Sequence, residues 1–550
     1  MSTLHPWWRG AVIYQVYPRS FLDTDGDGTG DLKGIAHKLD YIRDLGVDAL
    51  WISPFFKSPQ ADNGYDVEDY LDVDPLFGTL EDADTLIERA HARGLKVMVD
   101  LVFSHTSDRH PWFRESRQNR HNPKADWYVW AEPAADGTAP NNWLSIFGGT
   151  AWEYEPRRGE YYLHNFLKQQ PQLNLHQPAV VAALLEVAQF WLDRGVDGFR
   201  MDAIDYAVHD PKLTNNPVRP PEVPVPGGIA PGTPYARQLQ RYNKGQPDLL
   251  PILLRPLRAL CDRYGEIALL GELAGDGALA NAARYGGDGT GLHMAYTFDL
   301  LNCAYEADAI GGIVDELEAS LGGGWPSWSF ANHDVVRAPT RFGGLQPPEG
   351  LRRQLPVLLG SLRGTVCLYQ GCELGLDEAE LAFDDLRDPY GIAFWPLFKG
   401  RDGCRTPMPW TAEAPHAGFT SGQPWLPIPA LHRARSVTVQ EDEPASCLEE
   451  TRAFLAWRKC QKALIHGDWR RHPAPAGVLA FERATETQRL YCAFNLTDRK
   501  VEWMPPLELV PLDPPLAVPG ALATDGTVRL PAFGGLIAGL ADGGLIDETE

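Results

Sequence analysis

The chain has 550 residues, of which 44% are hydrophobic and 22% are charged, and its formal net charge is −23. This composition is typical of a globular protein and excludes a largely disordered chain. The acidic excess argues against binding to nucleic acid or anionic lipid, because both need a basic surface. No apolar run reaches the roughly 18 residues of a membrane helix. We therefore expect neither a nucleic-acid partner nor a membrane.

The eight cysteines are scattered along the chain without any CxxC pair. Unpaired cysteines are typical of a reducing compartment. The N-terminal residues 1–9 contain no apolar segment of the signal-peptide type. We expect a cytoplasmic protein, and the sequence leaves open whether it is a monomer or a homodimer.

Short apolar runs alternate with amphipathic helical patterns over most of the chain. Strands are predicted at residues 11–17, 49–52, 96–103, 198–202, 267–270, 296–299, 328–331 and 365–369. Helices are predicted at residues 35–45, 82–93, 180–194, 250–264 and 350–362. Continuous apolar strands indicate a parallel sheet covered on both faces, and about eight alternations fit an α/β (β/α)8 TIM barrel. A doubly wound open sheet is the alternative.

Three insertions, one of them at about 205–247, and a change of pattern define the expected organisation. The barrel is predicted over residues 1–105 and 177–469, with an inserted subdomain at 106–176 after strand three. A long loop insertion covers about 376–443. Residues 470–550 alternate as antiparallel strands do, which predicts a C-terminal β domain.

Charged side chains follow several of the predicted strands. In a barrel, catalytic groups lie at the C-terminal ends of strands. A single aspartate there is more often a helix cap or a turn former. Several carboxylates together with histidine and arginine at separate strand ends indicate one site instead. The residues concerned are Asp100, His105, Arg200, Asp202, Glu272, Asn332, His333 and Asp334.

Paired carboxylates are typical of glycoside hydrolysis, in which one is ionised and the other protonated. Arg200 lies two residues before Asp202, so both side chains point to the same side of a strand. The guanidinium would keep Asp202 ionised. Glu272 has no such neighbour in sequence, and its pKa could stay raised as an acid requires.

Four segments that contain these residues, VDLVFSH, GFRMDAID, LLGEL and FANHD, resemble the signature regions of the α-amylase family, glycoside hydrolase family 13. They occur in the family's order and at predicted strand ends. With YQVYPRSF and GRDGCRTPMPW, the resemblance covers most of the chain. It is closest to the exo-acting branch of α-glucosidases and oligo-1,6-glucosidases.

This resemblance implies a role for each matching residue. Asp202 would be the nucleophile, Glu272 the acid/base, and Asp334 a carboxylate that binds sugar hydroxyls in the transition state. Among the substrate-binding residues, His105 and His333 would bind hydroxyls of the same glucose. Arg200 would stand beside them, braced by Asp100.

The resemblance also implies a pocket closed behind one glucose. Tyr65 would stack on the sugar, Asp62 would bind its far hydroxyls, and Arg401 would pair with Asp62. A turn former is the alternative for Asp62, which precedes Asn-Gly. Phe166 is expected to line the pocket, as are Phe103 and Phe147, although core packing explains these aromatics equally well.

Residues 23–31 carry acidic and glycine residues at the spacing of an EF-hand loop, but position 12 of the pattern is Gly34, so the bidentate glutamate is missing. Relatives have a structural metal here. We expect one Ca²⁺ or Mg²⁺ and no organic cofactor. A solvated acidic turn is the alternative. The expected ligands are Asp23, Asp25, Asp27, Thr29 and Asp31.

Departures from the family pattern indicate the substrate. Ala203 follows the nucleophile, and Gln172 stands where the oligo-1,6-glucosidase type has Asp. Both favour α-1,4 over α-1,6 bonds, and the proline-rich stretch 217–234 would narrow the acceptor side. We expect a retaining exo-acting α-glucosidase that acts on short α-glucosides such as maltose. Transfer of glucose to alcohol acceptors is expected as well.

Several alternatives stay open within the enzyme class. They are a dedicated α-glucosyltransferase and a hydrolase of sucrose, trehalose or α-1,6-glucosides. A non-catalytic barrel that only binds ligands is disfavoured, because Asp202, Glu272 and Asp334 are all present. A serine hydrolase is weaker still, because the chain has no GxSxG motif.

Overall fold

The computed structural model describes residues 5–516 and 518–541 of the chain. Within them, eight parallel strands form a closed barrel in which β1 pairs with both β2 and β13. The predicted barrel is therefore confirmed, and the open sheet is excluded. The strands are β1 (Val12–Val16), β2 (Ala49–Ile52), β5 (Lys96–Leu101), β9 (Gly198–Met201), β10 (Ala268–Leu273), β11 (Met294–Thr297), β12 (Trp325–Trp328) and β13 (Thr365–Tyr369).

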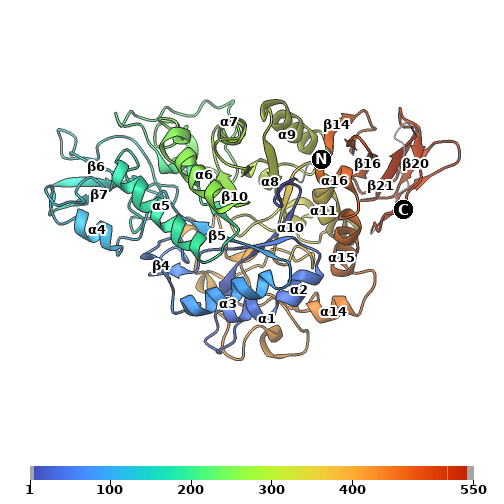
Figure 1. Ribbon diagram of the computed structural model, residues 1–550, viewed down its shortest axis with the longest axis horizontal. Coiled ribbons are helices and arrows are strands. Elements are labelled where there is room, and N and C mark those ends of the chain that lie inside the picture. The colour runs from blue at the N-terminus through green and yellow to red at the C-terminus, as the bar shows by residue number, and fades with distance from the viewer. Residues whose placement is uncertain (1–4, 517, 542–550) are drawn as a thin grey trace.

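Helices surround the barrel, as Figure 1 shows for those in front. In α3, Thr79 and Asp82 form a capping box, and buried residues recur every three or four positions on the face toward the strands. None of the helices in the described residues has the length and apolar character needed to cross a membrane. The main covering helices are α1 (Leu32–His37), α2 (Leu39–Asp44), α3 (Leu80–His91), α5 (Pro178–Asp193), α6 (Arg255–Cys261), α7 (Ala278–Gly286), α9 (Ala307–Ser320), α11 (Glu349–Ser361), α15 (Cys447–Arg458) and α16 (Lys462–His466).

Three local predictions were wrong. β11 begins two residues before the predicted strand 296–299, and Asp299 lies in helix α8 (Phe298–Asn302). β12 ends where the strand 328–331 was predicted to begin. The predicted helix 35–45 is two short helices, α1 and α2. The eightfold order is unaffected, because each strand is displaced by only two or three residues.

The inserted segment after β5 forms a small lobe at the left of Figure 1. It contains α4 (Pro111–Ser116) and a three-stranded sheet of β6 (Trp130–Ala131), β8 (Glu160–Leu163) and β7 (Trp152–Glu155). His105 and Gln172 form an antiparallel bridge where the chain enters and leaves the lobe. This bridge fixes the lobe beside the C-terminal end of β5.

Two other connections lie at the same end of the barrel. The first is the β3 (Phe56–Lys57) and β4 (Asp69–Val73) hairpin, which follows β2. The second, after β13, contains α12 (Pro389–Phe394), α13 (Ala430–Arg433) and α14 (Val437–Glu441). Between β12 and α11, a loop leads into α10 (Ala338–Gly343).

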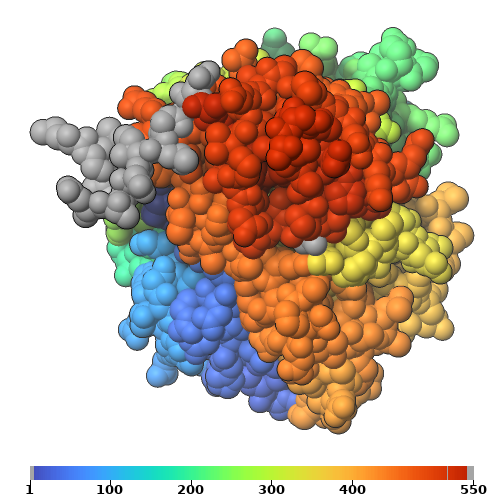
Figure 2. Space-filling view, turned by 90° about the vertical axis from the view of Figure 1, so that its right-hand side faces the viewer, coloured from blue at the N-terminus to red at the C-terminus, as the bar shows by residue number. Residues whose placement is uncertain are grey.

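A five-stranded and a three-stranded sheet follow α16. Arg483 donates from Nη1 to the carbonyls of Ser361 and Leu362, both at 2.8 Å, and so joins these sheets to the end of α11. Figure 2 shows the red C-terminal residues packed against the orange and yellow residues that precede them in the chain. Of the predicted β domain, residues 517 and 542–550 lie outside the described residues, as do residues 1–4 of the predicted barrel. The strands are β14 (Asp468–His472), β15 (Val478–Ala484), β16 (Arg489–Asn495), β17 (Val501–Trp503), β18 (Leu509–Val510), β19 (Ala521–Leu522), β20 (Val528–Leu530) and β21 (Gly535–Leu540).

Candidate active site

One buried guanidinium lies between three carboxylates at the C-terminal end of the barrel. Nη1 of Arg200, on β9, donates to Oδ1 of Asp100 at 2.8 Å and to Oδ1 of Asp202 at 2.6 Å. Its Nη2 lies 2.6 Å from Oε2 of Glu272 on β10. The expected pairing of Arg200 with Asp202 is present. Glu272 has no such neighbour in sequence, but it meets the same guanidinium in space, because β9 and β10 are adjacent strands.

The two carboxyls of the candidate reacting pair are buried and share Arg200. Burial raises the pKa of Glu272 to about 7 and that of Asp202 to about 7, although Arg200 opposes both shifts. Groups coupled this closely titrate as a pair, so near neutral pH the pair holds about one proton. Glu272 has further donors for its ionised form in the Tyr296 hydroxyl at 2.9 Å and the Ala203 amide at 3.0 Å.

Ala203 reaches Glu272 because of its unusual backbone. Its φ of 36° and ψ of 47° place it in the left-handed region. A β-branched residue is strongly disfavoured there. The short side chain of Ala203 lines the pocket beside Glu272.

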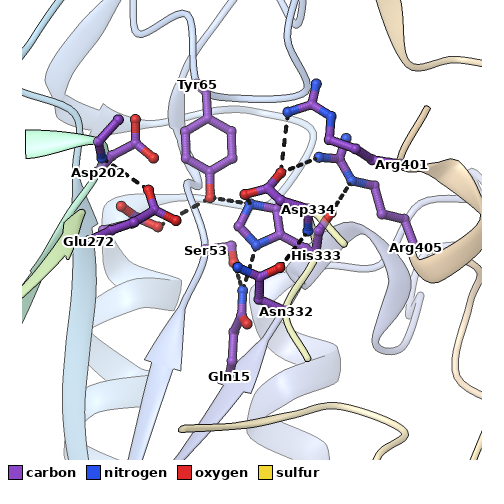
Figure 3. A network of polar contacts seen from close by, with 12 residues as sticks. Gln15, Ser53, Tyr65, Asp202, Glu272, Asn332, His333, Asp334, Arg401 and Arg405 are labelled. Carbon is purple, nitrogen blue, oxygen red and sulfur yellow. Dashed lines mark hydrogen bonds and ion pairs between the residues drawn. The ribbon is translucent and has the colours of Figure 1, made fainter. Parts of the chain in front are cut away.

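Asp334 lies in the loop after β12 and is held by two arginines. Its Oδ1 accepts from Nη2 of Arg405 at 2.9 Å and from Nη1 of Arg401 at 3.2 Å. Figure 3 shows Asp334 between these guanidinium groups and the ring of His333. Burial alone would raise the pKa of Asp334, but the charged guanidinium groups of Arg401 and Arg405 hold it well below its usual range. Asp334 is therefore ionised.

Tyr65 and His333 form one rigid unit beside Asp334. Their rings stack 5.3 Å apart, and the Tyr65 hydroxyl lies 2.6 Å from Nε2 of His333. The other ring nitrogen, Nδ1, lies 2.7 Å from Nε2 of Gln15. Burial lowers the pKa of His333 to about 3, so this imidazole is neutral at physiological pH.

On the side of Tyr65 away from Asp202 and Glu272, Arg401 forms a second ion-pair cluster (Figure 3). Nη2 of Arg401 donates to Asp62 at 2.8 Å and to Asp388 at 2.7 Å. Gln170 donates to the other oxygen of Asp62 at 3.1 Å, and its amide also lies 3.1 Å from Nε2 of His105. The expected pairing of Asp62 with Arg401 is thus present.

The pocket has a volume of about 820 Å³, including the part open to solvent. Its floor is polar. Its mouth is formed by mainly apolar residues from the inserted lobe and from the segments after β9, β10, β11 and β13. The floor residues are Asp62, Tyr65, His105, Asp202, Glu272, Asp334 and Arg401; the mouth residues are Ile146, Phe147, Phe166, Ala203, Tyr206, Gly227, Gly228, Ile229, Ala274, Gly275, Phe298 and Tyr390.

Two predicted substrate-binding residues do not line this pocket. Arg200 and His333 are fully buried and lie behind the lining, which they reach through Asp202, Glu272 and Tyr65. Phe103, proposed as a lining residue, is a core residue.

Sequence reasoning missed three residues that hold the floor together. Gln170, Asp388 and Arg405 are fully or almost fully buried, and each bonds a floor residue. Arg405 lies within the quoted GRDGCRTPMPW segment, so its motif was a signal that was not used. Asp388 lies in a long loop and had no comparable signal.

The acidic loop before α1 brings three of its predicted metal ligands together. Asp23, Asp25 and Asp27 each offer a carboxylate oxygen, and these oxygens lie within 4.8 Å of one another. Burial and the charges of the neighbouring aspartates raise the pKa of Asp27. Hard oxygen donors at this spacing fit Ca²⁺ or Mg²⁺.

Asp31 is outside this three-carboxylate group. Its Oδ1 accepts from the amide of Gly34 at 2.6 Å as the N-cap of α1, and its Oδ2 accepts from the amide of Thr24 at 2.7 Å. These bonds hold its carboxylate at the helix end, and its role as a metal ligand stays a prediction. Thr29 is buried in the same loop.

The chain matches a known family over most of its length. Residues 15–467 match the family described as "Alpha amylase, catalytic domain". The barrel, the acidic groups at its strand ends and this match agree. The chain belongs to the α-amylase family of glycoside hydrolases and is an enzyme of that family, which confirms the resemblance seen in its motifs.

Relatives within the family carry more specific names. The chain is 51% identical to a "Probable alpha-glucosidase" of Rhizobium meliloti (strain 1021), with 98% of each chain covered. It is 38% identical to an "Oligo-1,6-glucosidase" of Parageobacillus thermoglucosidasius, over 84% of this chain and 85% of that one.

Among solved structures, an alpha-glucosyl transfer enzyme, XgtA, is similar with a TM-score of 0.95 and 55% identity. The match covers 98% of this chain and 100% of XgtA. An isomaltulose synthase from Erwinia rhapontici NX5 is similar with a TM-score of 0.86 and 32% identity, over 98% of this chain and 100% of that one.

Proposed function

We propose that the protein is a retaining, exo-acting α-glucosidase that releases glucose from short α-1,4-linked glucosides such as maltose. We propose further that it transfers glucose to alcohols. The observation that carries the first proposal is the ion pair of Asp62 with Arg401 in the lining of the pocket, which would close it behind one glucose. The ion pair of Arg401 with Asp62 and Asp388 stands behind the space that the pair of Asp202 and Glu272 faces. A chain blocked there can enter only by its non-reducing end.

Two carboxyls on one guanidinium suit a double-displacement mechanism. Asp202 attacks the anomeric carbon while Glu272 gives its proton to the leaving oxygen, and the glycosidic bond breaks. The product is a β-glucosyl-enzyme with Glu272 ionised. Water or an alcohol then attacks the same carbon, Glu272 takes its proton, and Asp202 leaves as a carboxylate. The two inversions retain the α configuration.

Asp334, ionised and fixed by two arginines, would bind sugar hydroxyls as positive charge develops at the anomeric carbon. His105 and Tyr65 line the same floor and would bind the same glucose. These groups are held by bonds to buried partners, so little reorganisation accompanies the reaction.

The preference for α-1,4 bonds rests on Ala203, because a larger residue there would narrow the space for the second sugar. Gln172 supports it less directly: its side chain donates to the carbonyl of Tyr206 at 2.7 Å, and it is outside the pocket lining. Hydrolysis of α-1,6 bonds is the second candidate, since several relatives are named oligo-1,6-glucosidases.

Transfer to alcohols is supported by the apolar mouth. Ile146, Ile229 and Phe298 offer apolar surface there, which suits an alcohol that carries an apolar group. The name of XgtA, an alpha-glucosyl transfer enzyme, agrees with this proposal. A dedicated transferase would use the same residues and differ only in how well it excludes water.

We propose one structural Ca²⁺ or Mg²⁺ held by Asp23, Asp25, Asp27 and Asp31, with Thr29 contributing its carbonyl; the carboxylates of the first three lie close together. Oxygen ligands from one tight loop would stiffen that loop rather than act in the reaction. We also propose a cytoplasmic location, supported by the free cysteines of the described residues.

The test is product analysis with maltose, isomaltose, sucrose and trehalose, each with and without benzyl alcohol. Glucose released from maltose much faster than from isomaltose, first as the α-anomer by NMR, is the expected result. Release of the β-anomer would overturn the retaining mechanism. Turnover of isomaltose alone would overturn the linkage assignment, and absence of benzyl glucoside would overturn the transfer.

A further inference from the structure

A buried lysine lies just behind the mouth of the pocket. Lys244, near the end of the loop after β9, donates from Nζ to Oδ2 of Asp205 at 2.8 Å. The same ammonium also donates to the carbonyl of Ala274. The side chains of Lys244 and Asp205 are 3% and 0% exposed. Burying two charges costs desolvation free energy, and removing one partner of such a pair leaves the other charge buried and unpaired.

This ammonium joins the two segments that follow the reacting carboxyls. Asp205 comes three residues after Asp202, and Ala274 comes two residues after Glu272. Lys244 reaches both from 39 and 30 residues away along the chain. It therefore fixes the spacing between the continuations of β9 and β10 at the pocket.

The residues beside Lys244 hold it in place from the other side. Asn243 donates to Oδ1 of Asn165 in the inserted lobe at 3.1 Å and accepts from Asn216 at 3.0 Å. The amide of Gly245 donates to the carbonyl of Asp205 at 2.8 Å. Segment 243–245 is thus hydrogen-bonded to the inserted lobe and to two places in the segment that follows β9.

The surfaces that Lys244 supports belong to the mouth and not to the floor. Its Nζ lies 4.9 Å from the centre of the Tyr206 ring. A Cβ built on Gly275 would come within 3.0 Å of that Nζ. Tyr206, Ala274 and Gly275 all line the pocket, whereas no floor residue bonds Lys244 in the described structure.

We propose that Lys244 is a positioning residue for the acceptor. Through Asp205 and the Ala274 carbonyl it sets the shape of the mouth, and so the share of glucosyl-enzyme that an alcohol captures before water does. This inference rests on the proposed glucosyl transfer. Without the ammonium, the wall at Tyr206 and Ala274 would loosen and admit water, while the glucose-binding floor would keep its bonds.

The experiment uses α-glucosyl fluoride as donor, because fluoride leaves the mouth free for benzyl alcohol. Fluoride release measures formation of the glucosyl-enzyme, and free glucose measures hydrolysis. In Lys244→Met we expect the ratio of benzyl glucoside to glucose to fall about tenfold and the KM for benzyl alcohol to rise. Fluoride release without acceptor should stay within about threefold of wild type. Lys212→Met, at an exposed lysine of the same loop, is the matched control.

Asp205→Asn and the variant that combines it with Lys244→Met complete a double-mutant cycle. If the two residues act through one contact, the double variant changes the ratio no more than Lys244→Met does. A lowered melting temperature with an unchanged ratio would overturn the inference and leave Lys244 a stabilising residue only. An equal loss of fluoride release and transfer would overturn it too. Failure of wild type to release fluoride would overturn the proposed function itself.

Discussion

The floor and the mouth of the pocket are built from different parts of the chain and by different chemistry. The floor is charged, and most of its residues lie at or just after barrel strands, where each is held by buried partners. The mouth is mainly apolar and comes mostly from long connections after β5, β9 and β13, with a few residues from the segments after β10 and β11. Substitutions in the loops can therefore change which acceptor is used without changing how the transferred glucose is bound. The reason is that such substitutions leave the residues at the strand ends in place.

The floor should show the largest effect of a single substitution. In Glu272→Gln we expect hydrolysis of maltose to fall by on the order of 10³-fold, because general acid catalysis is lost. Release of fluoride from α-glucosyl fluoride, which needs little proton donation, should fall far less. Asp202→Asn should lose both activities, by on the order of 10⁴-fold or more. Initial rates with both donors measure this.

Glu306→Gln, at an exposed glutamate, is the control for these variants. Equal losses of maltose and fluoride turnover in Glu272→Gln would argue against its role as the acid. Retained activity in Asp202→Asn would remove that residue as the nucleophile.

The floor was also the region most open to sequence reasoning, because its signals are local. The approach of Arg200 to Asp202 follows from their spacing on one strand. The bond from Arg200 to Glu272 depends on β9 lying beside β10 in a particular register, which no local pattern specifies.

The mouth could not be predicted to the same depth. Its loops have no period of 2 or 3.6, so nothing in the sequence indicated that Ala230 would donate to the hydroxyl of Tyr390 at 2.8 Å across the pocket. The same reasoning failed at β12, where Pro326 lies inside the strand and the more apolar run after it was taken instead.

The end of the pocket should show the next largest effect. In Arg401→Lys we expect kcat/KM for maltose to fall about 100-fold, because a lysine cannot bond Asp62, Asp388 and Asp334 together. Hydrolysis of longer maltooligosaccharides should suffer less than hydrolysis of maltose if the pocket opens at this end. Arg387→Lys, at an exposed arginine nearby, is the control. A change of less than threefold would show that this cluster does not bind the glucose.

The pH profile tests the shared proton of the reacting pair. Because burial raises the pKa of Glu272 to about 7, its proton is lost as pH rises through that value. We expect kcat/KM for maltose to fall by about tenfold per pH unit above it. As pH falls, a second proton neutralises Asp202, and the rate declines again. The alkaline decline should vanish in Glu272→Gln assayed with α-glucosyl fluoride; its persistence would assign that limb to another group.

The mouth should respond more weakly and only in the choice of acceptor. In Ile229→Ser we expect transfer to benzyl alcohol to fall about fivefold relative to hydrolysis, through loss of apolar contact. Fluoride release without acceptor should be unchanged. Val218→Ser, at an exposed position of the same loop, is the control. If Ile229→Ser slowed fluoride release as much as transfer, the floor and the mouth would not be separable.

The acidic loop should have the smallest effect on the reaction and a clearer one on stability. The amide of Asp23 donates to the carbonyl of Phe419 at 3.0 Å, and the amide of Trp425 donates to that of Gly28 at 3.0 Å. The loop thus supports the connection after β13, which carries Arg401 and Arg405.

Chelation should lower the melting temperature by a few degrees, since ligand binding stabilises only the folded state. It should change the rate of fluoride release less than about twofold at 25 °C. Added Ca²⁺ or Mg²⁺ should restore the transition in wild type but not in Asp23→Asn. Equal melting with and without chelator would mean that the three carboxylates form a solvated turn, and that the connection after β13 is held by protein bonds alone.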